Sequence, residues 1–385
     1  MIDNLKNSQK NTLRKINLSN KDTSKNKDNS QYYDMVVFCH LRWQFVYQRP
    51  QHIISRMAKT MKTLFIEEPL HYTENGNPGN LIVVDEMLHV LQPNVQDIES
   101  IAAILPHYIK NKTIPVGWFY SASFCPLLES LQFETIVYDC MDELSLFKGA
   151  PAHLINQEKY LMAHADVIFT GGKSLYESKK QLHSNVYCFP SSVDQHHFAQ
   201  ALDGISIPHD IAHLQAPIVG YYGVIDERID LELLHETAKK LPNVSFVMIG
   251  PLAKIEEADL PKEQNIHYLG MKSYDELPHY LKAFDIAMMP FALNDATKYI
   301  SPTKTLEYMA AGKPIISTKI IDVVRDYSIC VSLIETADEF CEAIEFLFDK
   351  SDRQSMELEY YKILKKTSWD TTSDKMKSII KNFAK

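Results

Sequence analysis

Short apolar segments alternate with helix-compatible segments along most of the chain, and this alternation constrains the fold more than any other feature. One series of apolar segments runs from residues 35–39 to 186–189, and a second runs from 218–222 to 329–333 and includes expected strands at 266–269 and 315–318. The expected helices between them include residues 94–112 in the first series and 337–348 in the second. Near-continuous apolar strands that alternate with helices are typical of parallel sheets covered by helices on both faces. The pattern therefore predicts an α/β protein with two doubly wound, Rossmann-like domains that face a cleft.

The predicted domain boundaries come from changes in this pattern. The weakly patterned segment 195–216 indicates a linker, so we expect an N-terminal domain over residues 35–200 and a C-terminal domain over residues 201–369. Residues 1–34 are rich in Asn, Ser and Lys without an apolar period, which predicts a disordered polar tail. The length of 385 residues exceeds a usual single core and favours two domains.

The charge distribution bounds the classes of partner. The formal net charge of −9 argues against nucleic acid as the main partner, because no broad basic face is implied. Residues 1–34 carry seven Lys/Arg and four Asp/Glu, which gives +3. This tail is compatible with a weak peripheral contact with an anionic membrane, although a solvated tail is the simpler interpretation. The sequence has no apolar run of about 18 residues, so no transmembrane helix is expected.

The cysteines and histidines give no sign of a metal site. The six cysteines are scattered without CxxC spacing, which favours buried thiols in a reducing cytoplasm. His196, His197 and His235 also lack paired ligand spacing, so we expect no metal. The expected location is therefore cytoplasmic, with the inner face of the membrane as the alternative that the basic tail allows.

The stretch from Ser301 to Thr318 predicts a loop, a short helix and a buried strand. Ser301 suits the N-cap, and Pro302 suits the first helical position, where a missing N–H costs nothing. Gly312 can adopt the left-handed conformation after the helix, and Pro314 prevents its continuation.

The start of this helix is a candidate phosphate site. Free backbone N–H groups and the positive end of the helix dipole attract anions there, and Thr303 and Lys304 add a hydroxyl and a mobile positive charge. Glu307 lies a turn deeper on the same side, where an acceptor-only carboxylate suits the hydroxyls of a ribose. The alternative is a capped surface helix whose Lys–Glu pair is solvated.

Loops that follow the predicted strands supply the other candidate residues. Gly223 permits a sharp turn after residues 218–222, and Arg228 in the same loop could clamp a diphosphate. Gly250 ends the next strand, where either a structural turn or a close ligand approach would need glycine. Asp142 follows residues 135–139 and could orient an acceptor hydroxyl or act as its base, with an N-cap as the alternative role.

The loop after the first strand contains Trp43, which could stack on a sugar ring or pack in the core. Either Arg42 or Arg49, which flank it, could contact a phosphate.

Taken in order, Gly220–Asp230, Ile249–Pro251 and Ser301–Thr318 resemble the corresponding segments of GT-B nucleotide-sugar glycosyltransferases, and among them the large retaining family 4 (group 1). The segments His40–His52 and Tyr138–Glu143 are similar to a bacterial subgroup tied to polysaccharide and teichuronic-type cell-envelope synthesis. The resemblance is specific in the C-terminal half and looser in the N-terminal half.

This resemblance implies a hexosyltransferase-type enzyme that moves a sugar from a nucleotide-diphosphate sugar, such as a UDP-sugar, to a glycan, lipid-linked or small-molecule acceptor. It also implies retention of configuration, no essential metal and no cofactor beyond the donor. The C-terminal domain would hold the donor and the N-terminal domain the acceptor. A C-terminal helix at about residues 370–385 would cross back to the first domain.

Residue by residue, the resemblance implies that Arg228 binds phosphate, that the amides of Ser301, Pro302 and Thr303 grip the diphosphate, and that Glu307 binds ribose. Two family positions differ, because the family's first glutamate falls at Tyr299 and its lysine falls near Leu233. Our hypothesis is that Lys304 supplies the missing positive charge.

The expected catalytic residues are thus Arg228, Lys304 and Asp142. The competing functions are a nucleotide-sugar 2-epimerase of the same fold and a non-catalytic nucleotide-sugar-binding protein.

Overall fold

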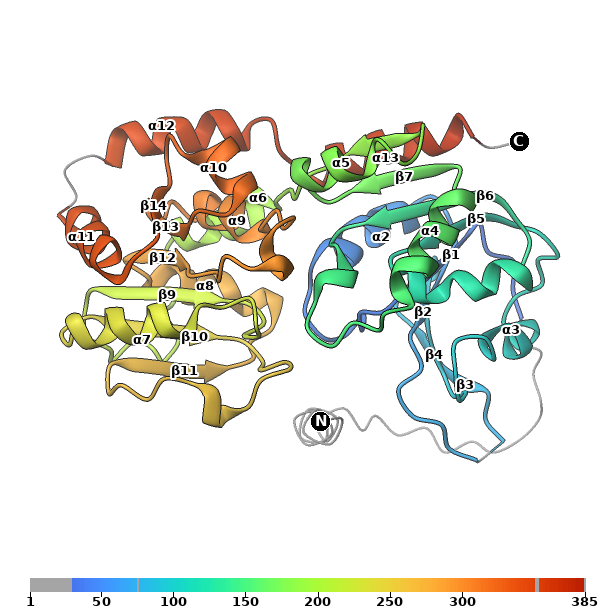
Figure 1. The fold of residues 1–385 in the computed structure, drawn as a ribbon, viewed down its shortest axis with the longest axis horizontal. Helices are drawn as coiled ribbons and strands as arrows, with labels where there is room; N and C mark the ends of the chain where they lie inside the picture. Colours follow the sequence, from blue (N-terminus) through green and yellow to red (C-terminus); the bar gives the residue numbers. More distant parts are fainter. Residues whose placement is uncertain (1–29, 75, 350–352, 384–385) are drawn as a thin grey trace.

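The computed structural model describes residues 30–74, 76–349 and 353–383, which form two α/β domains side by side (Figure 1). Within these residues the N-terminal domain has one sheet of order β3-β4-β2-β1-β5-β6-β7-β8, and the C-terminal domain has one of order β11-β10-β9-β12-β13-β14. The strands of the first sheet are β1 Met35–Cys39, β2 Thr63–Glu67, β3 Gly79–Val83, β4 Leu88–Pro93, β5 Ile114–Phe119, β6 Phe133–Cys140, β7 Val167–Thr170 and β8 Val186–Cys188. Those of the second sheet are β9 Ile218–Tyr222, β10 Ser245–Ile249, β11 Ile266–Gly270, β12 Ile286–Met289, β13 Ile315–Thr318 and β14 Ser332–Ile334.

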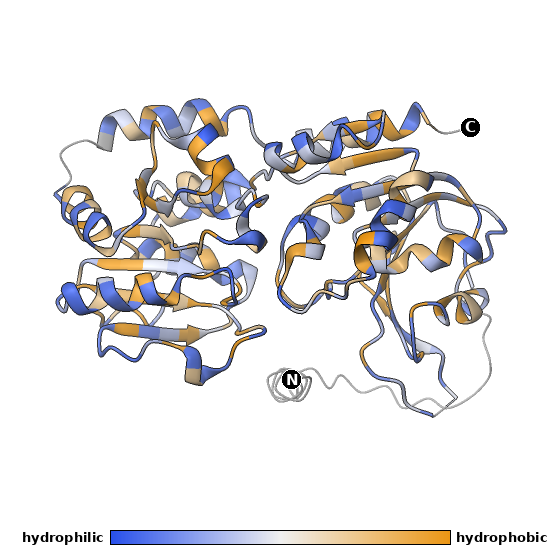
Figure 2. Ribbon diagram, in the orientation of Figure 1, coloured by the Kyte–Doolittle hydropathy of each residue, from blue (hydrophilic) through white to orange (hydrophobic). Residues whose placement is uncertain are grey.

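The helices connect the strands and cover the sheets. Those of the N-terminal domain are α2 Arg49–Ala58, α3 Ile101–Ile104, α4 Leu154–His164 and α5 Lys173–Lys179. The remaining helices are α6 Gln195–Ala199, α7 Leu231–Lys240, α8 Leu277–Ala283, α9 Thr303–Ala310, α10 Ile321–Tyr327, α11 Ala337–Phe348, α12 Arg353–Leu364 and α13 Trp369–Lys381. Figure 2 shows hydrophobic residues along the strands and hydrophilic residues distributed over the outer helices. The predicted class, two doubly wound domains, is confirmed.

One edge of the first sheet departs from the predicted parallel arrangement. β3 pairs antiparallel with β4, while the other strand pairs in the described residues are parallel. The two strands are joined by the short segment 84–87, which is long enough for a hairpin but too short for a helical crossover.

Three local expectations were wrong. The helix expected over residues 94–112 shrinks to α3 and one 3₁₀ turn that contains Pro106, which cannot continue an α-helix. The strand expected at 329–333 is shifted to β14, and Ile329 is 75% exposed. The expected linker 195–216 contains α6, whose Phe198 is fully buried in the core of the C-terminal domain.

The last part of the expected N-terminal tail is folded. Residues 1–29 of the expected tail lie outside the described residues, whereas residues 30–34 pack on the N-terminal domain. Tyr33 is buried, and its hydroxyl forms a hydrogen bond of 2.7 Å with Nδ1 of His89. Its aromatic ring belongs to the core of the N-terminal domain. The prediction missed this because the average composition of residues 1–34 is polar.

The chain passes between the two domains twice, near residues 189–194 (the first crossing) and near residues 365–368 (the second crossing). After the second crossing, α13 packs against α2 of the N-terminal domain (Figure 1). Trp369 stacks on His52 with ring centroids 4.8 Å apart, and Asp370 pairs with Arg56. Within the described part of the chain, no helix has the length and apolar character needed to span a bilayer.

Candidate functional site

A pocket lies between the two domains at the carboxyl ends of their strands. This is the position at which open α/β sheets usually bind ligands. Loops after β6, β7, β8, β9 and β12 contribute to it, together with the start of α9. Its lining includes most of the predicted site residues, namely Asp142, Gly223, Arg228, Ser301, Pro302, Thr303, Lys304 and Glu307.

The start of α9 differs slightly from the prediction. The N-cap is Pro302 rather than Ser301, and no side chain caps the helix. Ser301 instead contacts the first interdomain crossing, because its carbonyl oxygen accepts a hydrogen bond of 2.5 Å from the hydroxyl of Ser191. The helix therefore begins at Thr303 with its first backbone N–H groups not bound by a capping side chain, which is the arrangement that attracts an anion.

Lys304 extends from α9 across the loop after β9. Gly223 has φ of +139°, and a Cβ on it would lie 2.3 Å from Cε of Lys304. The lysine ammonium lies 5.5 Å from the ring centre of Tyr221. Burial lowers the pKa of Lys304, and the charge of Glu307 opposes this shift. A side chain at Gly223 would thus displace the cation from the pocket.

Gly250 lies behind this loop and does not line the pocket. Its φ is +149°, and a Cβ on it would lie 1.8 Å from the carbonyl oxygen of Gly223. The close backbone approach expected at this glycine is therefore to Gly223. We infer that Gly250 allows the Gly223 turn to form.

Arg228 is held at the pocket by Asp226. Its Nε lies 2.9 Å from Oδ1 of Asp226, and its Nη2 lies 2.7 Å from Oδ2. Burial lowers the pKa of Arg228, but the hydrogen bonds and charge of Asp226 more than offset this, so the pKa lies above its ordinary value. The guanidinium also lies 5.4 Å from the ring centre of Phe147, which belongs to the other domain.

Asp142 reaches the same pocket from the N-terminal domain. Burial raises its pKa to about 6, although Arg228 and Arg49 favour the ionised form. A carboxyl with a pKa near neutral, facing cations across a cleft, is suited to accept a proton. The alternative N-cap role is not observed, because Glu143 occupies the N-cap position of the next 3₁₀ turn, which no side chain caps.

Glu307 is buried at the inner end of the pocket. The hydroxyl of Tyr222 donates a hydrogen bond of 2.6 Å to its Oε2. Burial raises the pKa of Glu307, and the charge of Lys304 opposes that shift. The second carboxylate oxygen is therefore the one available to a ligand hydroxyl.

Tyr47 and Tyr274 line the pocket but were not identified from the sequence. Their rings lie 4.6 Å apart across the domain boundary, and Tyr274 stacks on His197 at 4.1 Å. The hydroxyl of Tyr274 is buried and has no hydrogen-bond partner among the described residues. For Tyr274, the sequence signal was its position shortly after the strand expected at 266–269, and that signal is weak.

The N-terminal arginines and Trp43 have structural partners. Arg49 is buried and donates hydrogen bonds to both carboxylate oxygens of Asp139. Arg42 pairs with Glu67 and does not line the pocket. Trp43 also lies outside the lining and packs on Phe65 at 5.1 Å. Arg49 lines the pocket while its guanidinium binds Asp139 and the carbonyl of Phe189, so its phosphate contact stays a prediction. The predicted phosphate contact of Arg42 and the predicted sugar stacking of Trp43 have no support in this geometry.

The two positions that depart from the family pattern also lie outside the pocket. Tyr299 packs against the hydrophobic core of the N-terminal domain, and Leu233 is buried in that of the C-terminal domain. Lys304, by contrast, does line the pocket, as the hypothesis of a replacement charge requires.

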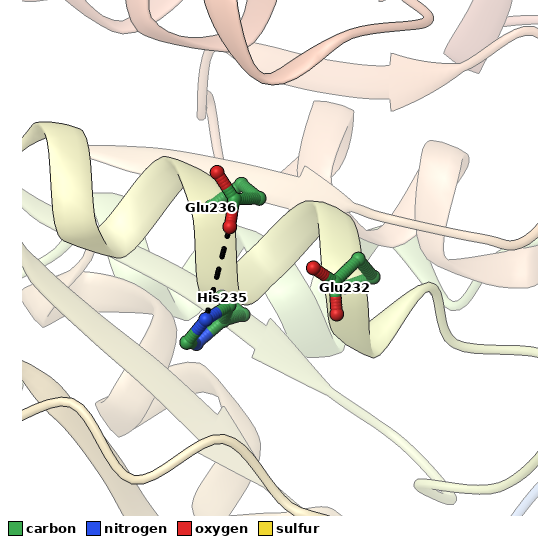
Figure 3. Close-up of side chains that lie close together, drawn as sticks. All are labelled: Glu232, His235 and Glu236. Carbon is green, nitrogen blue, oxygen red and sulfur yellow. Dashed lines mark ion pairs between the residues drawn. The ribbon is translucent and has the colours of Figure 1, made fainter.

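A group of potential metal ligands lies on α7, away from this pocket. Glu232, His235 and Glu236 place one ligand atom each within 4.8 Å of one another (Figure 3). Nδ1 of His235 lies 2.8 Å from a carboxylate oxygen of Glu263. None of these residues lines the interdomain pocket, so the group is not part of this site.

Comparison with known proteins identifies the class of fold. Residues 216–350, which include most of the C-terminal domain, match the family model described as glycosyl transferases group 1. The chain is 25% identical over 221 residues to a protein named as a teichuronic acid biosynthesis glycosyltransferase, TuaH of Bacillus subtilis (strain 168). The match covers 53% of this chain and 55% of TuaH, so the chain spans about half the length of this curated relative.

Solved structures extend the likeness to both domains. Trehalose-6-phosphate synthase from E. coli, solved with UDP-2-fluoro glucose, gives a TM-score of 0.66 at 12% identity and covers 90% of this chain and 98% of its own. Sucrose-phosphate synthase from Thermosynechococcus elongatus gives 0.62 at 13% identity, with the same coverage. Anabaena HepE, solved with UDP and glucose, gives 0.63 at 11% identity and covers 91% and 100%. The fold is therefore GT-B, and the predicted resemblance to group 1 glycosyltransferases is confirmed.

Proposed function

We propose that this protein is a glycosyltransferase that moves a sugar from a nucleotide-diphosphate sugar to an acceptor during cell-surface polysaccharide or glycoconjugate synthesis. The observation that carries the proposal is the convergence of Arg228, Lys304 and the start of α9 on one interdomain pocket, with Glu307 at its inner end. Cations and backbone N–H groups match a diphosphate, and a buried carboxylate matches ribose hydroxyls.

In this proposal the diphosphate binds against the first turn of α9. Arg228 and Lys304 stabilise the negative charge that develops on the leaving diphosphate as the bond to the sugar breaks. Two protein cations and a helix start could supply this stabilisation, which supports the proposal that no metal is essential. The paired state of Arg228 with Asp226 keeps its guanidinium oriented toward the pocket before the donor binds.

The acceptor would approach from the N-terminal side of the pocket. Asp142 lies on that side, and its pKa of about 6 suits a carboxylate that accepts a hydrogen bond or proton from a hydroxyl near pH 7. Retention of configuration is proposed on the resemblance to family 4. The name of TuaH supports an acceptor in an envelope polysaccharide.

The proposed partners are accordingly a UDP-type nucleotide sugar and a glycan, lipid-linked or small-molecule acceptor, with no role for nucleic acid. The proposed place of action is the cytoplasm or the inner face of the membrane.

A non-catalytic nucleotide-sugar-binding protein is the second candidate. Tyr299 stands where the resemblance places the first glutamate, and it packs away from the pocket. The pocket thus lacks a carboxylate that the family uses beside the sugar, which favours binding without transfer. A 2-epimerase of the same fold stays a third candidate.

Nucleotide sugars tested one by one in a thermal-shift screen would identify the donor, because a ligand that binds only the native state raises its melting temperature. The stabilising donor is then incubated with and without acceptor glycans, with and without EDTA, and the anomeric configuration of the product is determined by NMR. Transfer that needs an acceptor supports the proposal. Release of a free 2-epimeric sugar from donor alone would indicate the epimerase, and stabilisation without turnover would indicate the binding protein.

The variant Glu307→Ala should weaken donor affinity while the fold stays intact. Glu307→Gln is the matched variant that keeps the side-chain volume and the partner of Tyr222. Unchanged calorimetric affinity in both variants would contradict the assignment of this pocket to the donor.

A further inference from the structure

A second cavity, of about 690 Å³, lies at the interdomain hinge, next to the proposed donor pocket but distinct from it. The two cavities share only Ser191 of the first crossing. The second is open to solvent and is lined by residues 188–192 at and after the end of β8, the end of α10, the second half of α12 and the first turns of α13. Its volume falls in the range of ordinary ligand sites, which is about 300–1,000 Å³.

The charges around this hinge cavity are predominantly positive, in a chain whose formal charge is −9. Four lysines and two acidic residues line it, which leaves a surplus of two positive charges. The acids are already paired, since Asp326 binds Lys173 and Glu359 lies 2.6 Å from Nζ of Lys362.

The surplus belongs to Lys366 and Lys375. Lys366 lies just beyond α12, and Lys375 lies on α13, so the two approach the cavity from either side of the second crossing. Neither has an ion-pair partner within the described residues, and both are exposed. A hydrated ammonium without a protein counter-ion can exchange its water for an anion that enters the cavity.

A buried hydroxyl at the same cavity supplies an independent observation. Ser192 lines the cavity and is only 1% exposed, and its Oγ has no hydrogen-bond partner among the described residues. A buried hydroxyl without a partner is costly, and a ligand or water at the cavity would supply the missing partner. Thr371 and Thr372 add further hydroxyls at the first turn of α13.

We propose that the hinge cavity is a second binding site, for a ligand that carries a phosphate or diphosphate group. Lys366 and Lys375 would bind the charge, and Ser192 would donate its hydroxyl to a phosphate oxygen. Because both domains and both crossings line the open cavity, an occupant that contacts all of them favours the domain arrangement that keeps these walls together. The proposal does not depend on the identity of the donor.

The test compares two double variants that remove the same charge. Lys366→Ala/Lys375→Ala removes the cations of the cavity, and Lys365→Ala/Lys381→Ala removes two exposed lysines of the same region that do not line it. Inorganic phosphate and pyrophosphate are titrated by calorimetry. Both variants and the unmodified protein are also measured with Arg228→Ala added, which separates this cavity from the donor pocket.

We expect Lys366→Ala/Lys375→Ala to lower the phosphate affinity at least tenfold, and Lys365→Ala/Lys381→Ala to change it by less than twofold. Ser192→Ala should lower the affinity severalfold without lowering the melting temperature, because the unbound protein loses only an unpaired hydroxyl. A second arm measures co-sedimentation with phosphatidylcholine vesicles with and without phosphatidic acid.

Loss of soluble phosphate binding in the cavity variant alone would assign a free phosphate ligand, and loss of vesicle binding alone would assign a lipid headgroup. Equal behaviour of the two double variants in both arms would overturn the proposal. A protein that binds phosphate here but no nucleotide sugar would contradict the proposed function and leave this inference standing.

Discussion

Each domain places an arginine–aspartate pair beside the cleft, and the two pairs differ in what surrounds them. In the N-terminal domain, Arg49 and Asp139 have side-chain exposures of 6% and 0%, and Nη1 of Arg49 also donates to the carbonyl of Phe189. In the C-terminal domain, Arg228 is 25% exposed and Asp226 is 7% exposed. The first arginine has its donors committed to protein acceptors, whereas the second keeps part of its guanidinium open to the pocket.

The same kind of ion pair can therefore serve the fold or the ligand, depending on how far its arginine is exposed to the cleft. Arg49 ties α2 to β6 and to the end of β8, so it holds the N-terminal wall together. Arg228 pairs with a residue of its own loop, so it can exchange one anion for another without disturbing distant elements.

The largest expected effect comes from breaking the enclosed pair. Asp139→Asn leaves the Arg49 charge buried without its counter-ion and should lower the free energy of unfolding by about 3–5 kcal/mol. Asp226→Asn, the matched change in the open pair, should cost about 1 kcal/mol, because water reaches Arg228. Urea unfolding of both variants measures the difference. Equal losses would show that the two pairs have the same role.

Removal of the open arginine should affect transfer and leave the fold intact. Arg228→Ala should lower the transfer rate by about 10²–10³-fold, the usual cost of a lost donor to a developing negative charge. Arg228→Lys keeps the positive charge but loses the planar guanidinium, so its transfer rate should lie between those of the unmodified protein and Arg228→Ala. Steady-state kinetics, with the melting temperature as a control, measure this. Undiminished turnover in the alanine variant would exclude Arg228 from the mechanism.

The pH dependence should report Asp142, which faces Arg228 across the pocket. Its pKa of about 6 predicts that transfer rises with pH through 6, as the carboxylate forms. Asp142→Asn should lower the rate at pH 7.5 about 10²-fold and abolish this rise.

The same shift has the opposite sign for stability. The folded pKa of Asp142 lies above its ordinary value of 3.8, so the folded state holds the proton more tightly and loses stability as pH rises from about 4 to 6. Asp142→Asn avoids this loss and should become the more stable protein above pH 6. Parallel stability curves for the two proteins would argue against the raised pKa.

The smallest expected effect concerns the ring that covers Arg228 from the other domain. The contact of Phe147 with the guanidinium is a cation–π interaction, worth about 0.5–1 kcal/mol at such a site. Phe147→Ala should release Arg228 and tighten donor binding about two- to fivefold, as measured by calorimetry. Leu146→Ala, a neighbouring change that removes no aromatic ring, is the control. Weaker binding in Phe147→Ala would mean that the ring positions Arg228 for the ligand.

Much of the fold could be predicted because local signals agreed with tertiary packing. The strands at 218–222 and 315–318 and the helix at 337–348 were located to the residue, since apolar runs there are bounded by Gly, Pro or capping residues. Segments without such boundaries failed, as in the expected helix over 94–112.

The candidate site was predictable for a related reason. Arg228, Lys304 and Asp142 all follow or flank strand ends, and parallel strands bring their carboxyl ends to one edge of a sheet. Tyr47 lies in the loop after β1 but was missed, because its contact with Tyr274 crosses the domain boundary and no local pattern specifies it.

Periodicity and turn chemistry are local properties, so the amino-acid sequence was enough to predict two mainly parallel sheets and most of the groups at their carboxyl ends, but not the antiparallel edge strand β3. Only the tertiary structure decided which arginine is open to a ligand. Asp226 lies two positions from Arg228, but the partner of Arg49 lies 90 positions away, and no local pattern specifies that contact. The hinge cavity has the same origin, since residues of both domains must fold together before Ser192, Lys366 and Lys375 surround one space.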